Sequence, residues 1–131
     1  MILAVNSYCQ LISKSDAYPH NKDSGAFKSV EVIAEFPGGI EAWTQYLTEN
    51  LDNNVPVRNG APDGKYIIIS EFIIDKSGNL VEIKFLTDPG YGMTEEIKRV
   101  LAKSPKWRPA NQNFKYIRSY RTQKFIFRVG N

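Results

Sequence analysis

The sequence predicts an α+β fold, with two helices packed on one face of a three-stranded antiparallel or mixed sheet. Apolar residues recur at helical spacing in 40–51 and again in 94–103. Two strand-forming runs, 66–75 and 80–86, flank a glycine-containing turn, and a third run follows the second helix at 115–129. The resulting order, helix, strand, strand, helix, strand, is typical of a two-layer domain.

Length and composition are those of one soluble globular domain. The chain has 131 residues, of which 42% are apolar and 24% charged. No apolar run approaches the roughly 18 residues of a membrane span. Residues 1–28 are mixed and polar, and turn-forming residues interrupt any periodicity. We therefore expect a flexible leader at 1–28 before a folded domain at 29–131.

Few residues of the kinds that carry catalysis or bind metals are present. The single cysteine, Cys9, excludes an internal disulfide, and the single histidine, His20, excludes His-based triads and His-rich metal sites. Glu95 and Glu96 are neighbours on a helix, where adjacent side chains do not face each other, and the helix dipole accounts for both. We expect no enzyme activity, catalytic residue, cofactor or metal.

The first helix is predicted to follow the turn 36–39 and to end at 52–54. Its apolar face consists of Ile40, Trp43, Leu47 and Leu51. Core packing explains this stripe better than a ligand site does. Residues 55–64 contain two prolines and two glycines and are expected to form a loop.

The strand 66–75 is apolar on both faces, which favours a central position in the sheet. Gly78 supplies the positive φ of the hairpin turn, and 80–86 alternates as a half-buried strand does. Thr94 is the predicted N-cap of the second helix, which Pro105 terminates.

A single core cluster is predicted from these periodicities. Trp107 stands between Pro105 and Pro109, which prevent a helix and hold the aromatic side chain against the layer beneath. The predicted members are Trp43, Leu47, Phe72, Ile74, Ile83, Val100 and Trp107.

The stretch 115–129 has no Gly, Pro or acidic residue and reads as one strand of up to about fifteen residues, longer than is usual. If 66–75 is central, the last strand pairs with its free side and becomes an edge. The unpaired backbone of such an edge is hidden, self-paired or used to bind another strand.

Positive charge gathers at the C-terminal end, although the net charge is only +3. From residue 97 onward there is no Asp or Glu, and the basic residues are Lys98, Arg99, Lys103, Lys106, Arg108, Lys115, Arg118, Arg121, Lys124 and Arg128. The asymmetry indicates either an anionic partner or protection of a sheet edge against aggregation.

Four motifs in one order resemble the C-terminal domain of TonB-type energy transducers, especially the form common in Bacteroidetes. They are E-F-P-G-G at 35–39, F-I-I-D-K-S-G-N-L at 72–80, T-E-E-I-K-R-V-L at 94–101 and P-K-W-R-P-A-N-Q-N at 105–113. The last is similar to the family signature P-x-W-x-P-x-x-Q-N. The resemblance covers roughly 34–129.

The resemblance implies a periplasmic domain that grips the TonB box, a short peptide of outer-membrane receptors, for energy-coupled transport. The peptide adds as a strand beside the last strand, a recognition mode called β-augmentation. An inner-membrane motor complex would be a partner only if a longer native chain carries an anchor, because this sequence has neither a membrane helix nor a Pro-rich spacer.

The predicted peptide-binding residues are Ile117, Arg118, Ser119, Tyr120, Arg121, Thr122, Gln123 and Lys124. The family pattern favours the odd-numbered side chains of this strand facing the helices, which leaves Arg118 and Lys124 free for acidic residues of the peptide. The same edge predicts a homodimer at high concentration.

The chain departs from the family pattern at several positions. Phe114 replaces a usual glycine, Ser119 and Arg121 replace apolar residues, Gln123-Lys124 replaces Leu-Pro, and Val55-Pro56 replaces Tyr-Pro. These changes concern the selection of the peptide rather than the fold.

A nucleic-acid-binding module is the alternative, because aromatic residues interleave with the basic ones as stacking platforms do. The aromatics in question are Trp107, Phe114, Tyr116, Tyr120, Phe125 and Phe127. Their other interpretation is packing in the core and along the edge, and we expect no nucleic acid partner. A structural or sensory domain with the same fold also remains open.

Overall fold

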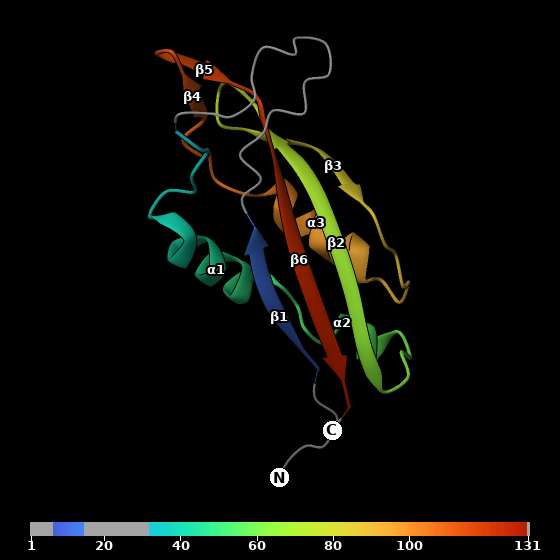
Figure 1. Ribbon diagram of the computed structural model, residues 1–131. Helices are drawn as coiled ribbons and strands as arrows, with labels where there is room; N and C mark the ends of the chain where they lie inside the picture. The colour runs from blue at the N-terminus through green and yellow to red at the C-terminus, as the bar shows by residue number, and fades with distance from the viewer. Residues whose placement is uncertain (1–6, 15–31, 131) are drawn as a thin grey trace.

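The computed structural model describes residues 7–14 and 32–130 (Figure 1). In chain order its elements are β1 (Ser7–Lys14), α1 (Gly39–Asn50), α2 (Val55–Arg58), β2 (Gly64–Ile74), β3 (Leu80–Phe85), α3 (Met93–Ala102), β4 (Ala110–Gln112), β5 (Lys115–Ile117) and β6 (Ser119–Val129). The predicted α+β fold is confirmed: α1 and α3 lie on one face of a sheet that contains the predicted hairpin and the last strand.

The main sheet has four strands in the order β1-β6-β2-β3, and all its pairings are antiparallel. β2 and β6 pair over their whole length, from Gly64 opposite Val129 to Ile74 opposite Ser119. β2 therefore has a partner on each side, as its two apolar faces predict.

The prediction that the last strand is an edge is wrong. β1 pairs with β6 from Ser7 opposite Val129 to Lys14 opposite Thr122, so this part of β6 lies inside the sheet. The physical reason is that β1 supplies the backbone partners that a terminal strand otherwise lacks. Eight residues of the expected flexible leader are thus a strand, and the rest of 1–28 lies outside the described residues.

The predicted strand 115–129 is divided into β5 and β6 at Arg118. β5 turns back on β4 in a separate two-stranded sheet, with Asn113 and Phe114 between them at φ 53° and 64°. Positive φ at both central residues is the geometry of a tight type I′ hairpin. The hairpin diverts the start of the expected strand away from the main sheet.

Two further local expectations are corrected. Residues 55–58 form the short helix α2 rather than a loop, and Pro56 suits the first turn of a helix because its missing N–H needs no partner there. Thr94 does not cap α3: Gly92 occupies the N-cap at φ 75°, and the Thr94 hydroxyl donates to Asp88 Oδ1 at 3.3 Å.

The core lies between the helices and the sheet, and six of the seven residues predicted for it belong to this cluster. Ile83 is partly buried against the cluster, and the other six are buried. Trp43 and Trp107 pack edge to face in this core, with ring centroids 4.8 Å apart.

Trp107 is held at both its backbone and its ring. Its N–H donates to Gly78 O at 2.8 Å, and its Nε1 donates to Ser104 Oγ at 3.0 Å. A side chain at Gly78 would place its Cβ 2.1 Å from Trp107 O. The hairpin turn and the proline-flanked segment therefore pack backbone to backbone, which only glycine allows.

Candidate peptide-binding strand and adjoining pocket

The predicted peptide-binding residues alternate between buried and more exposed side chains, as the family pattern implies. On the helix side, Ile117, Ser119, Arg121 and Gln123 are buried. On the other side, Arg118 is exposed and Tyr120, Thr122 and Lys124 are half-buried. The odd-numbered set therefore faces the core.

The backbone of the predicted site is already paired along much of its length. β2 lies beside it from Ser119 onward, and β1 lies on the opposite side from Thr122 onward. A peptide that adds to β6 at Thr122–Lys124 has to take the position of β1.

Gln123 joins β6 to α1 through the core. Its Oε1 accepts a hydrogen bond from Trp43 Nε1 at 2.8 Å, and its backbone carbonyl accepts one from Ser70 Oγ at 2.8 Å. A buried indole N–H needs a partner, and Gln123 provides it. The side-chain oxygen of Ser119 is also buried, and it has no hydrogen-bond partner among the described residues.

Arg121 is the most buried basic side chain of the described residues, with 8% of its surface exposed. Its Nη1 donates to Ala34 O at 2.6 Å, and its guanidinium carbon lies 5.1 Å from the centre of the Trp107 ring. Hydrogen bonding and a cation–π contact thus offset the cost of burying the charge. The arginine ties residue 34 to the sheet.

The segment that carries Ala34 runs beside the signature stretch. Val32 bridges to Asn111 and Glu35 to Arg108, the latter pair with backbone hydrogen bonds in both directions of 2.9 and 2.8 Å. Glu35 and Arg108 also form an ion pair at 2.7 Å, with both side chains about half exposed. We call residues 32–36 the arm.

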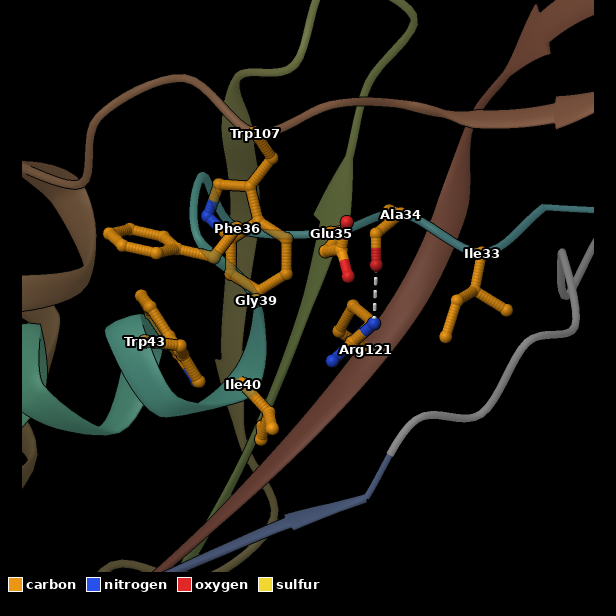
Figure 2. A pocket seen from close by; sticks show the side chains of 9 residues that line it. All are labelled: Ile33, Ala34, Glu35, Phe36, Gly39, Ile40, Trp43, Trp107 and Arg121. Atoms are coloured by element: carbon orange, nitrogen blue, oxygen red, sulfur yellow. Dashed lines mark hydrogen bonds between the residues drawn. The ribbon is translucent and has the colours of Figure 1, made fainter.

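A pocket of about 190 Å³ opens between the arm, the first turn of α1 and β6 (Figure 2). Figure 2 shows Arg121 between Ile40 of α1 and Ile33 of the arm. The pocket is lined by Ile33, Ala34, Glu35, Phe36, Gly39, Ile40, Trp43, Trp107 and Arg121. Ile33 and Ile40 at the pocket are 40% and 52% exposed, whereas the two tryptophans are buried.

The expectation that Arg118 is free for a peptide is wrong. Its Nη2 lies 2.7 Å from Glu82 Oε2, in an ion pair whose side chains are 55% and 57% exposed. The pair joins the connection between β5 and β6 to β3. An acidic peptide residue would have to compete with Glu82.

A third ion pair, between Glu96 and Arg99 of α3, lies away from this site and is hydrogen-bonded to the end of α1. Glu96 accepts hydrogen bonds from Arg99 and from the Asp52 N–H, and Arg99 also donates to Asn50 O. Burial by itself raises the pKa of Glu96, but the hydrogen bonds from Arg99 and Asp52, with the charge of Arg99, lower its pKa on balance. This cluster stabilises the packing of α3 against the end of α1.

Only two of the aromatics that motivated a nucleic-acid platform are strongly exposed, Phe114 at 100% and Tyr116 at 55%. Trp107, Phe125 and Phe127 are buried and cannot stack on bases. Within 7–14 and 32–130 no cluster of three or more potential metal ligands occurs, and no helix is long and apolar enough to cross a membrane.

Sequence reasoning did not find the pocket, although one signal pointed toward it. Ser119, Arg121 and Gln123 are polar at alternate positions that face the core. Polar residues on a buried strand face indicate that something specific accepts their hydrogen bonds. The arm is the partner of Arg121 alone, and it is distant from β6 in the sequence.

Comparison of the chain with protein-family models, curated proteins and solved structures finds no match.

Proposed function

We propose that this chain is a TonB C-terminal-like domain, which binds an extended peptide of an outer-membrane receptor as a strand added to β6. The pairing of β1 with β6 carries the proposal. A segment far away in sequence lies along β6 in antiparallel register from Ser7 to Lys14. This side of β6 therefore accepts an extended chain, which is the requirement of β-augmentation.

The peptide has to replace β1, in whole or in part. Main-chain hydrogen bonds are the same whichever strand makes them, so the exchange is close to balanced in backbone energy. β1 has the advantage of being tethered, with an effective concentration on the order of millimolar. We therefore expect β1 to weaken the binding of a free peptide, and side-chain contacts to decide which peptide succeeds.

The motifs of the sequence support the proposed partner. The P-x-W-x-P-x-x-Q-N resemblance falls on 105–113, where Trp107 is packed in the core and the arm is anchored beside it. The proposal accordingly includes a periplasmic location and receptors of the energy-coupled transport class. Coupling to an inner-membrane motor complex would require an anchor on a longer native chain.

The proposal is tested by weakening β1 within the full chain. Leu11→Pro and Ile12→Pro are made separately, because only alternate residues of β1 donate an N–H toward β6 and proline removes that donor. Peptides copying the N-terminal segments of outer-membrane receptors are then titrated and followed by NMR. One of the two proline variants should bind more tightly than the original chain, with shifts along Ser119–Val129.

Leu11→Ala and Ile12→Ala keep the backbone N–H and serve as matched controls, and each should bind the peptides less tightly than the proline variant that lacks the donor toward β6. If the peptides bind none of these proteins, or if the shifts are confined to α1 or to residues 87–93, the domain does not bind receptors in the proposed manner.

A further inference from the structure

We infer that the pocket beside Arg121 takes one apolar side chain, of leucine or phenylalanine size, from the strand that adds to β6. The pocket would then select one residue of the bound peptide, whereas the backbone pairing along β6 is indifferent to sequence. This inference rests on the proposed strand addition and concerns its selectivity.

The register of the sheet leads to the pocket. β1 reaches Lys14 opposite Thr122, so a strand in the same register that is one residue longer reaches the position opposite Arg121. Residues directly opposite in an antiparallel pair have side chains on the same face. Since Arg121 faces the helix side and lines the pocket, the residue paired with it extends its side chain into the pocket.

The size of the pocket fits one large side chain. It measures about 190 Å³. An apolar cavity of roughly 150 Å³ already holds a benzene molecule. A leucine or phenylalanine side chain therefore fits, and an alanine leaves most of the space unfilled.

The lining favours an apolar occupant. Six of its nine residues are apolar: Ile33, Ala34, Phe36, Ile40, Trp43 and Trp107. The two charged groups are already engaged, Glu35 with Arg108 and Arg121 with the carbonyl of Ala34 and the Trp107 ring. A carboxylate would have to disturb these contacts, whereas a hydrocarbon side chain leaves them in place.

The exposed surfaces of Ile33 and Ile40 supply the driving force. They are 40% and 52% exposed and lie on opposite sides of the Arg121 side chain (Figure 2). An occupant between them removes apolar surface of both isoleucines from water.

The test uses a probe whose register is known from the structure. Fluorescent nine-residue peptides copy Ser7–Lys14 and end in one added residue, which is Leu, Phe, Ala or Glu. Each is titrated under reducing conditions into the full chain that carries whichever β1 substitution, Leu11→Pro or Ile12→Pro, removes the N–H donor toward β6, and binding is measured by anisotropy. The Leu and Phe peptides should bind roughly tenfold more tightly than the Ala peptide, as expected for filling an apolar pocket, and the Glu peptide should bind most weakly.

Ile33→Ser and Ile40→Ser should abolish the preference for Leu over Ala. Ile67→Ser is the matched control, because Ile67 is also exposed, at 37%, but lies on β2 outside the pocket. This control should retain the preference in full.

The failures of the two proposals are distinguishable. Equal binding of all four peptides, or tightest binding of the Glu peptide, would overturn the pocket inference and leave strand addition intact. A preference for Leu that survives Ile33→Ser and Ile40→Ser would also overturn it. Absence of binding by every peptide would overturn both proposals.

Discussion

Two aromatic residues of the same stretch have opposite environments. Trp107 is 3% exposed, and Phe114, at the tip of the β4–β5 hairpin, is 100% exposed. Both are large apolar residues among basic neighbours, so composition alone does not separate them. Trp107 lies between prolines over a layer of aromatics, whereas the turn that contains Phe114 projects its side chain into solvent.

The difference shows that the backbone conformation at each position, rather than the hydrophobicity of the residue, determines whether the side chain is buried or exposed. The Trp107 N–H donates to the carbonyl oxygen of Gly78, and this position places its ring in the core. Phe114 occupies a left-handed position at φ 64°, which bulky residues adopt at a cost. The Phe114 side chain is fully exposed, so its own packing offsets none of this cost.

The largest expected effect is the loss of Trp107. Trp107→Ala should destabilise the domain by about 3–5 kcal/mol, because it leaves a cavity among packed rings. Phe114→Ala should change the stability by less than about 0.5 kcal/mol. Chemical unfolding of both variants measures the contrast, and similar values for the two would contradict it.

The glycine beneath Trp107 gives a second, smaller contrast. Gly78→Ala brings a Cβ 2.1 Å from Trp107 O at φ 89°, whereas Gly90→Ala at φ 87° meets nothing within 4 Å. Backbone strain should cost each variant about 1–2 kcal/mol. The clash should cost Gly78→Ala a further 1–3 kcal/mol or so. Thermal melts of the pair would isolate the close approach, and equal shifts would argue against it.

The acidic residues give the same contrast between a buried and an exposed position. Glu96 has only 9% of its side chain exposed, and its pKa is lowered below the ordinary 4.5. The charged Glu96 therefore stabilises the folded state above pH 4.5, and this contribution is lost as the pH falls through the lowered pKa. Glu96→Gln should cost about 1–2 kcal/mol at neutral pH, since a hydrogen bond to a charged group weakens. The deficit should shrink in acid.

Glu82→Gln is the matched variant for this pH test, because the pair with Arg118 near the hairpin is more than half exposed. It should change stability little at any pH. Unfolding curves recorded from neutral to acidic pH compare the two; a deficit for Glu96→Gln that persists at the lowest pH would mean that charge is not its source.

The smallest effect is of opposite sign. Phe114→Gly should stabilise the domain by about 1 kcal/mol, because glycine adopts φ 64° without strain. Phe114→Ala, which keeps the strain and removes the ring, is the control. If Phe114→Gly lowers the melting temperature, the ring contributes to the fold despite its exposure.

Local patterns determined much of this protein in advance. The first helix was predicted from the helical spacing around Trp43, and the central strand from the run of β2 that is apolar on both faces. The position of Trp107 between two prolines predicted its burial in the core. The reason is that burial on one face imposes a period on the sequence, and the period can be read without knowing the partner. Alternation also divides the β6 residues into an odd-numbered and an even-numbered set. The choice of the odd-numbered set for the core came from the resemblance to the TonB-type domain, and Ser119, Arg121 and Gln123 are buried.

Only the tertiary structure decided what lies beside β6. The pairing of β1 with β6 depends on backbone groups that every sequence possesses. For this reason no residue pattern in 1–28 predicted the pairing. The pocket likewise brings together the arm, α1 and Arg121, which are far apart in the chain and meet only after the sheet forms. Contacts between distant segments carry no sequence period, and for this reason the neighbour of the last strand and the shape of the candidate site could not be predicted.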